Sequence, residues 1–433
     1  LGAAALSDGD ATTAIKHLAT IVSLAEKGNP QAQELVAQIR LPLAQLYLAA
    51  GQSKKAQRTC LEILNAKDET EAATSIAKAR QLTGLAISTV QSDRQPSELE
   101  VELLQSLYRF LVQSDPQKSP GDSNEALNEL CITVSRALVN ALCRRSEFEA
   151  AVVHLQHEIT RSPPNTQAYS ELLTGVQVAA TQHYFQKRDF EKCRDMAKRI
   201  DLDSLDAAQQ ITIRIILLDC HFQARQLTSA DEISNWFGQY FKEHDEATDR
   251  PSWYPTVQLR RAQVAYSLRK YSEALALVRS GLEQTSNESL RVEFRILDAK
   301  LAIAQVRFSD ARAVLQQLTD ELPRQSTQSQ QVYWMTGELD FLQRRYAAAA
   351  EAYRTLVDSD APAWKPLALV QLAKCHELLG DPERALSCYQ QVAEMAQNAE
   401  APKTATVARA IEQAKQRLAV IAANQPAEGQ INR

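Results

Sequence analysis

The chain has 433 residues, of which 48 are basic and 53 acidic, so its formal net charge is −5 with both signs interspersed. No basic field is present to gather phosphates, and nucleic acid is therefore not an expected ligand. Only 12 Gly and 15 Pro occur, and no run of alternating β-branched residues is found, which argues against a sheet-based fold and predicts an all-α chain.

No apolar stretch approaches the roughly 18–20 residues of a membrane span, so we expect no membrane insertion. Hydrophobic residues make up 45% of the chain, which is enough for an extended core. The length exceeds that of one compact domain. A stack of repeats tolerates such a length because each unit packs only on its neighbours.

One pattern of side-chain sizes recurs along the chain: a small residue, a second small residue twelve positions later, and a bulky residue four positions after that. In the stretch 367–392 these positions are Ala373, Ala385 and Tyr389. Between the two apolar helical faces, Gly380 and the Asp-Pro pair after it supply a helix stop, a cap and a helix start. The unit therefore predicts two antiparallel helices joined by a tight turn.

At the start of the chain, Ala14 and Leu18 match the second helix of such a unit, with Gly9 at the turn and Gly2 as the early small residue. The first hairpin is thus truncated and residue 1 is not Met, so we expect a fragment or processed product of a longer protein; a frayed short first helix is the alternative. In the next unit, Pro42 predicts a kink or a break in the first helix. The positions of this unit that fall on the pattern are Ala44, Tyr47, Gly51, Ala56, Cys60 and Ile63.

The pattern then loosens, and helical runs at 72–90 and 99–112 predict a degenerate third unit. Residues 1–113 are therefore expected to form an N-terminal group of repeats. Residues 114–124 combine Pro, Gly, Ser and Asp without an apolar period and are the best candidate for a flexible loop or hinge. Tandem repeats are expected from 125 to 401.

Within this longer group the pattern varies in quality. Its triplets are Val139/Ala151/Leu155, Thr181/Cys193/Ala197, Leu218/Ala230/Ser234, Ala262/Ala274/Val278, Ala299/Ala311/Leu315 and Gly337/Ala349/Tyr353. The third triplet is the poorest match. In the three units that precede the one with Ala385 and Tyr389, an aromatic residue, at Tyr271, Phe308 or Tyr346, is expected to wedge the turn. Residues 402–423 predict a helix that caps the last hairpin, and 424–433 a disordered tail.

The second small positions at 274, 311, 349 and 385 lie 37, 38 and 36 residues apart, and a period in the thirties with two helices per period is typical of a solenoid. These residues resemble the tetratricopeptide repeat family, strongly over 256–396 and more weakly elsewhere. The resemblance implies a right-handed superhelical solenoid of antiparallel helix pairs with a role in protein–protein association. In that family the first helix of each hairpin lines the concave face. One group of members binds C-terminal carboxylates there with Asn and basic residues, a clamp that this chain lacks.

By that resemblance, the inner positions of the C-terminal repeats are largely apolar with charged residues between them. The partner-binding residues we expect are Leu259, Tyr266, Ile296, Ile303, Trp334 and Phe341. The alternative for Trp334 and Phe341 is that their rings pack against a neighbouring helix. Asp298 and Asp340 stand where the pattern wants packing residues, so the register of their helices stays open.

Motifs that carry chemistry are scarce. No Gly-rich phosphate loop, HExxH, GxSxG or CxxC occurs, so we predict no catalytic residue, cofactor site or metal site. His154 and His157, followed by Glu158, come nearest to a metal pair, but a firm zinc site needs further ligands, and we favour a solvated helix surface. Seven Cys without regular spacing indicate buried free thiols and favour a reducing compartment such as the cytoplasm.

The sequence therefore predicts a non-enzymatic scaffold that binds a peptide or helix of a protein partner on its concave face. One alternative is a regulatory or substrate-recruiting arm of a larger enzyme whose catalytic domain lies N-terminal to this fragment. Another is a purely structural subunit of a large assembly.

Overall fold

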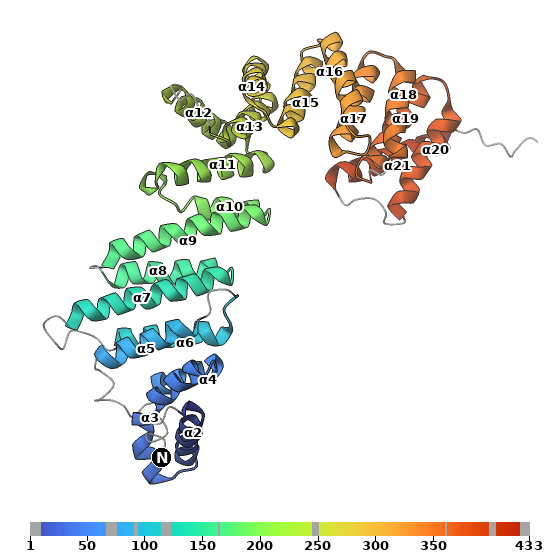
Figure 1. The fold of residues 1–433 in the computed structure, drawn as a ribbon. Helices are drawn as coiled ribbons and strands as arrows, with labels where there is room; N and C mark the ends of the chain where they lie inside the picture. The colour runs from blue at the N-terminus through green and yellow to red at the C-terminus, as the bar shows by residue number, and fades with distance from the viewer. Residues whose placement is uncertain are drawn as a thin grey trace, which may run out of the picture. The chain divides into compact units, whose positions relative to one another are not determined.

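The computed structural model describes residues 10–65, 76–90, 94–113, 123–162, 165–244, 251–359, 362–397 and 404–424. Every regular element in these ranges is a helix, as the composition predicts. Contacts within the chain group it into two compact units, Leu1–Cys220 and His221–Arg433, whose helices are labelled in Figure 1. The expected turn at Gly9, most of the expected hinge and nearly all of the expected tail lie outside the described residues.

The helices of the first unit follow the predicted runs closely. They are α2 (Ala11–Glu26), α3 (Pro30–Ala49), α4 (Ser53–Asn65), α5 (Ile76–Thr89), α6 (Glu98–Gln113), α7 (Ser123–Arg144), α8 (Phe148–Arg161), α9 (Thr166–Gln186), α10 (Phe190–Ala197), a short 3-10 turn η3 (Leu202–Ser204) and α11 (Ala207–Gln223). α3 continues through Pro42 without a break. The degenerate unit is formed by α5 and α6, which both pack on α7.

The helices of the second unit are more regular in length. They are α12 (Leu227–Glu243), α13 (Tyr254–Ser267), α14 (Tyr271–Gln284), α15 (Glu288–Ala304), α16 (Phe308–Glu321), α17 (Thr327–Leu342), α18 (Tyr346–Asp358), α19 (Lys365–Leu378), α20 (Pro382–Gln397) and α21 (Ala405–Asn424). The consecutive pairs α13/α14, α15/α16, α17/α18 and α19/α20 form hairpins, and α21 covers the last one by packing on α20 and α19. Glu412, Lys415 and Gln416 form the exposed face of α21.

The hairpin turns share one backbone device. After the first helix, a residue takes a positive φ, and the next N–H bonds the carbonyl five positions back, which is the pattern of a Schellman motif. Lys270 N donates to the Ala265 carbonyl at 2.8 Å, and Asp381 N to the His376 carbonyl at 2.9 Å. Glycine takes the positive φ in only some of these turns; the other residues that do so, with φ between 59° and 63°, are Ser146, Arg188, Arg225, Arg269, Val306 and Arg344.

The small residues of the repeat pattern mark where helices touch. The alanines of the pattern that are 0% exposed include Ala262, Ala274, Ala299, Ala311, Ala349, Ala373 and Ala385. Gly337 shows the reason, because a Cβ added there would lie 2.6 Å from Cε1 of Tyr353, the bulky member of its own triplet. Even in the poorest sequence match, Leu218, Ala230 and Ser234 are at most 2% exposed. Tandem helix pairs packed at this period form the helical hairpin repeat fold that the side-chain pattern predicts.

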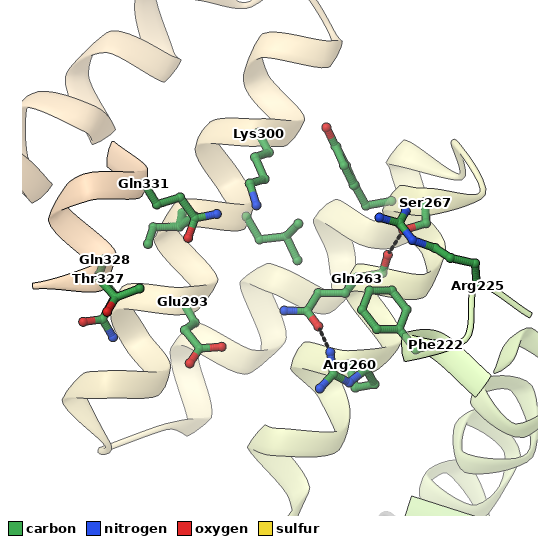
Figure 2. Close-up of a pocket in the computed structure, with 13 residues that line it drawn as sticks. Phe222, Arg225, Arg260, Gln263, Ser267, Glu293, Lys300, Thr327, Gln328 and Gln331 are labelled. Carbon is green, nitrogen blue, oxygen red and sulfur yellow. Dashed lines mark hydrogen bonds between the residues drawn. The ribbon is translucent and has the colours of Figure 1, made fainter. Parts of the chain in front are cut away.

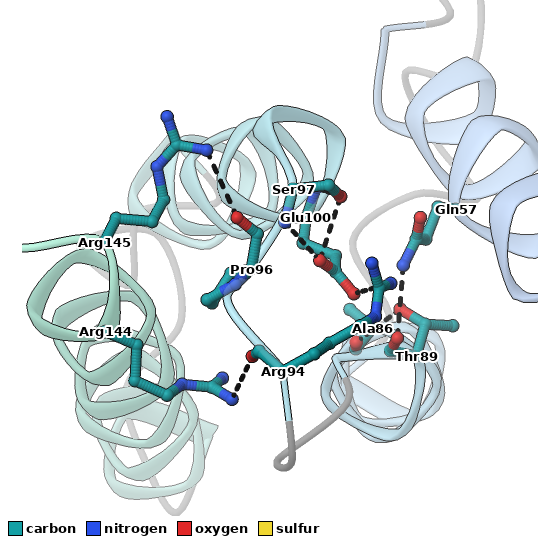
Figure 3. A network of polar contacts seen from close by, with 9 residues as sticks. All are labelled: Gln57, Ala86, Thr89, Arg94, Pro96, Ser97, Glu100, Arg144 and Arg145. Atoms are coloured by element: carbon teal, nitrogen blue, oxygen red, sulfur yellow. Dashed lines mark hydrogen bonds and ion pairs between the residues drawn. The ribbon is translucent and has the colours of Figure 1, made fainter.

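Polar contacts support the irregular part of the first unit (Figure 3). Glu100 is fully buried and accepts hydrogen bonds from the N–H and hydroxyl of Ser97 at 2.5 and 2.9 Å. The N–H of Glu100 donates in return to the Ser97 hydroxyl at 3.4 Å, which completes a capping box. The other carboxylate oxygen of Glu100 accepts from Arg94 at 3.0 Å. Arg144 and Arg145, near the end of α7, donate to two backbone carbonyls of the segment before α6. This segment is therefore held in place although it has no apolar period.

One helix among the described residues is long and apolar enough to cross a membrane, namely Glu125–Arg144 in α7, with a mean hydropathy of 1.2. This corrects the expectation that no stretch approaches that length. Half of the apolar window is buried inside the fold, and a core helix passes the same test of length and composition. Its apolar side chains pack in two core clusters of the first unit, which include Val134 and Leu138. The helix is thus weak evidence for a span.

Candidate functional site

The first helices of three successive hairpins, α13, α15 and α17, line a groove in the second unit. α15 contacts both α13 and α17, and a cavity of about 760 Å³ opens along them (Figure 2). We call this cavity the first-helix groove. Its lining comprises Phe222 and Arg225; Arg260, Gln263, Tyr266 and Ser267 of α13; Glu293, Ile296, Leu297 and Lys300 of α15; and Thr327, Gln328 and Gln331 of α17.

Cations outnumber anions on this lining. Arg225, Arg260 and Lys300 face a single acid, Glu293. The Arg260 guanidinium lies 4.7 Å from the ring centroid of Phe222 and donates to the Gln263 amide oxygen at 2.5 Å, so its position is fixed from two sides. Burial lowers the pKa of Lys300, while Glu293 acts in the opposite direction. A partly desolvated ammonium gains from any anion that enters the groove.

The groove includes two of the six residues predicted to bind a partner. Tyr266 is half-buried and Ile296 is 4% exposed, and both line the cavity. Leu259 is 5% exposed and packs in the core cluster of α13 to α15. Ile303 is half-buried against the next cluster. Leu259 and Ile303 lie outside the lining, so the structure brings only Tyr266 and Ile296 together.

Trp334 and Phe341 lie on α17, beyond the lined cavity. Both are half-buried and pack on the core of the last hairpins. The Trp334 ring lies 5.5 Å from that of Tyr353 and 5.4 Å from that of Trp364, while Phe341 lies 5.4 Å from Tyr346, the aromatic residue at the turn. Each ring therefore packs on other aromatic residues and is still partly exposed.

The two acids that conflict with the pattern have different surroundings. Asp340 is 3% exposed, and its carboxylate lies 2.6 Å from Arg312 and 2.7 Å from Arg345. At this position, ion pairs take the place of the apolar contact that the repeat pattern predicts. Asp298 is half-buried, and burial raises the pKa of its carboxyl although Arg307 and Arg279 act against that rise. Neither acid lines the first-helix groove.

The two histidines singled out in the sequence have different hydrogen-bond partners. His154 Nε2 lies 3.1 Å from the Ser135 hydroxyl, whereas His157 Nδ1 lies 2.9 Å from Glu158. Glu158 is 1% exposed and forms an ion pair with Arg161 at 2.7 Å. Among the described residues no group of three or more potential metal ligands is found. His154 thereby contacts α7, and Arg161 also donates to the Tyr108 hydroxyl of α6 at 2.9 Å. Because Glu158 is buried and paired, this part of α8 is more than a solvated helix surface.

All seven cysteines are free thiols, and only Cys143 is not fully buried. Burial raises the pKa of Cys60 to about 12 and that of Cys143 to about 11. The Sγ atoms of Cys193 and Cys220 lie 3.3 Å apart between α10 and α11. The thiols are therefore interior packing groups, as their irregular spacing predicts.

Sequence reasoning missed the part of the groove that precedes α13. Phe222 lies in the last turn of α11, in the residues from His221 onward that belong to the second unit, and Arg225 takes the positive φ of the following turn. The turn after α11 was the one available signal. A Schellman turn fixes the backbone conformation at the helix end, and with it the direction in which the residues around the turn point. The pattern of triplets describes helix contacts and carries no information on which turn residues face a groove.

No protein-family model and no curated protein matches this sequence. Solved structures do resemble the fold. The Cut9 and Hcn1 hetero-tetramer of the APC/C matches with 12% identity over 97% of this chain and 83% of that one, at a TM-score of 0.38. A tetratricopeptide repeat protein from Parabacteroides merdae matches with 13% identity over 73% and 94%, at 0.31. Yeast Tom70 matches with 15% identity over 98% and 96%, at 0.32. With scores this low, the helical repeat fold rests on the turns and contacts of this chain itself.

Proposed function

We propose that this chain is a non-enzymatic interaction scaffold that binds a segment of a protein partner in the first-helix groove. The observation that carries the proposal is a cavity of about 760 Å³ lined by three adjacent first helices. A groove made by parallel, evenly spaced helices suits an extended or helical segment, whose side chains recur at comparable distances. Tyr266 and Ile296 supply apolar contact area, and the charges around them set the register.

The excess of cations predicts the character of the partner segment. Three basic side chains against one acid favour a segment with apolar residues flanked by Asp or Glu. Such charges contribute mainly to the association rate and to specificity, while a buried aromatic or aliphatic anchor contributes most of the affinity. Trp334 and Phe341, further along α17, are proposed to extend the apolar contact.

A peptide selection tests the proposal. A displayed library of random 12-residue peptides is selected on the full chain, and binding of the recovered peptides is measured by fluorescence anisotropy. We expect apolar and acidic sequences, and we expect Lys300→Glu to weaken them more than about tenfold, on the order of 1.4 kcal/mol. Arg409→Glu is the matched control, because it reverses the same charge at an exposed position of α21.

A double variant tests whether Trp334 and Phe341 extend the apolar contact of the groove. Trp334→Ala combined with Phe341→Ala should weaken the same peptides by about tenfold or more while helical content is unchanged. A loss of helical content would identify the two rings as core. Recovered peptides that bind Lys300→Glu as well as they bind the unmodified chain would place the binding site outside the groove.

A further inference from the structure

A second cavity, of about 580 Å³, lies in the second unit between α12, α13 and α14. Its lining is separate from the first-helix groove and mostly polar: Asn235, Gly238, Gln239, Phe241, Lys242, Tyr254, Gln258, Arg261, Glu273, Ser280 and Gln284. The volume is within the range of small-molecule sites. One residue in this lining is physically unusual.

Arg261 is only 8% exposed, yet all its hydrogen bonds go to neutral groups. Its Nη1 donates to the Gln258 amide oxygen at 2.8 Å, and its Nε to the Ser234 hydroxyl at 3.4 Å. The guanidinium carbon lies 5.7 Å from the centroid of the Phe241 ring. Among the described residues no carboxylate lies within ion-pair distance of this guanidinium.

A buried guanidinium without an anion is costly. Arginine stays charged in proteins, and an uncompensated buried charge costs several kcal/mol. The other buried charges described above have their counter-ions: Glu100, Glu158 and Asp340 each contact an Arg side chain at 3.0 Å or less. Arg261 is the exception among these, and it is the one that lines a cavity.

The third nitrogen of Arg261 has room for a ligand. Nη2 makes none of the hydrogen bonds of this side chain and lies beside Gly238, where an added Cβ would come within 2.6 Å of it. Gly238 also lines the cavity. The absence of a side chain at this point of α12 therefore leaves the guanidinium accessible from the cavity.

We propose that this cavity is an oxyanion site, in which Arg261 binds a carboxylate or phosphate group of a ligand. Lys242, exposed on the same lining, supplies a second positive charge. The amides of Asn235, Gln239 and Gln284 supply hydrogen bonds for the remainder of a polar ligand. A guanidinium presents paired N–H groups that match both kinds of oxyanion. This inference is independent of the proposed partner groove.

Glu273 is the rival counter-ion, since it shares the lining and acts on Arg261 electrostatically without contacting it. If Glu273 serves Arg261 in solution, the unmodified chain does not respond to external anions and only Glu273→Gln does. If the site takes an external oxyanion, the unmodified chain already responds, and removing the charge of Glu273 strengthens that binding. The response of the unmodified chain, compared with that of Glu273→Gln, therefore separates the two possibilities.

The test measures the unfolding midpoint of the full chain, followed by tryptophan fluorescence, in sodium phosphate, sodium succinate and sodium chloride at equal ionic strength. Binding to the native state raises the midpoint, so we expect a saturable rise with phosphate, succinate or both, and none with chloride. Succinate alone would identify a carboxylate ligand, and phosphate alone a phosphate ligand. Glu273→Gln should tighten binding about threefold or more.

Two variants should abolish the response. Arg261→Met removes the charge, and Gly238→Ala adds a Cβ against Nη2; each should weaken binding at least about tenfold. Arg279→Met is the matched control, since it removes an exposed charge from the neighbouring α14 and should respond like the unmodified chain. Gly238→Ala keeps the test valid if Arg261→Met fails to fold.

Three outcomes would overturn the proposal. The first is an equal response to all three salts or to none of them. The second is a response that appears only in Glu273→Gln, which would make Glu273 the counter-ion. The third is a response that appears only when Asp245, Glu246 and Asp249 are changed to amides, which would mean that this chain supplies its own anion.

Discussion

Two buried charges, one in each unit, have opposite surroundings. In the first unit, Glu158 is 1% exposed and accepts hydrogen bonds from Arg161, which also donates to the Tyr108 hydroxyl at 2.9 Å. In the second unit, Arg261 is almost as buried, but its contacting groups are an amide, a hydroxyl and a ring. A buried charge with its counter-ions stabilises the contact between helices. A buried charge without a counter-ion destabilises the fold, and a ligand that supplies the missing charge can offset that cost on binding.

This contrast predicts unequal costs of removing an arginine. Arg161→Ala leaves the carboxylate of Glu158 with fewer donors and should lower the free energy of unfolding by about 3 kcal/mol. Arg261→Met replaces a charge that has no contacting counter-ion by an apolar chain of similar length, and without added anion it should leave the free energy of unfolding unchanged or raise it by up to about 4 kcal/mol.

Urea unfolding can separate the two units. All four tryptophans, at 236, 253, 334 and 364, belong to the second unit, so fluorescence follows that unit alone and circular dichroism follows both. Arg161→Ala should shift the dichroism transition without the fluorescence transition. A large loss of stability in Arg261→Met would show that Arg261 is as well paired in solution as Glu158 is.

The same contrast shows what the sequence could predict. The triplets such as Ala373, Ala385 and Tyr389 gave the hairpins, their turns and their contact positions, because close helix packing imposes a regular period on side-chain size. The fold class and most helix bounds follow from that period. Arg261 directly precedes Ala262, which is one of these contact positions. The period predicts the size of the side chain at position 262, but it does not predict the residue type or the role of position 261.

The remaining site features depend on tertiary contacts. The partners of Arg261 come from two different helices, with Ser234 on α12 and Gln258 on α13. The first-helix groove depends on Phe222 and Arg225, which reach it through a turn. The ion pairs of Asp340 likewise join three elements. Residue spacing along one helix cannot reveal such combinations.

Glycines sharpen the comparison between the units. In the second unit, a Cβ at Gly337 would lie 2.6 Å from the Tyr353 ring, whereas a Cβ at Gly84 of α5 in the first unit meets nothing within 4 Å. Gly337→Ala should therefore lower the free energy of unfolding by about 2 kcal/mol through overpacking.

Gly84→Ala should have the opposite sign, raising the free energy of unfolding by about 0.5–1 kcal/mol, because alanine is the better helix former. Fluorescence should report the Gly337→Ala loss and dichroism the Gly84→Ala gain. If both substitutions destabilise, the first unit is as tightly packed at α5 as the second is at α17.

The turns offer a smaller test. Val306 takes a φ of 62° in the turn between α15 and α16 and is 68% exposed, so a β-branched residue bears backbone strain without a compensating contact. Val306→Gly should raise the free energy of unfolding of the second unit by about 1 kcal/mol. Gly51→Ala, at the corresponding turn of the first unit where φ is 70°, should lower stability by a similar amount. Equal stability of both variants and the unmodified chain would show that these turns are not strained.

The dependence of stability on pH should show the smallest effect. It distinguishes an acid with counter-ions, Glu158, from one without a contacting counter-ion, Asp298. Burial alone would raise the pKa of Glu158, but hydrogen bonds from Arg161, Tyr108 and His157 hold it below its ordinary value of 4.5. The stability it contributes is therefore complete above pH 4.5 and is lost as the pH falls through the lower folded pKa. Glu158→Gln should flatten the acid side of the dichroism stability profile.

Asp298 should behave in the opposite sense. Burial raises the pKa of its carboxyl above the ordinary 3.8, so its contribution to stability is complete below pH 3.8 and is lost as the pH rises through the folded pKa. Asp298→Asn should therefore raise the fluorescence midpoint at pH 7 and change it little at low pH, while Asp320→Asn, at an exposed position of α16, serves as the matched control. A midpoint at pH 7 that falls in Asp298→Asn would mean that Arg307 or Arg279 pairs with this acid in solution, and the distinction between paired and unpaired acids would then fail at this residue.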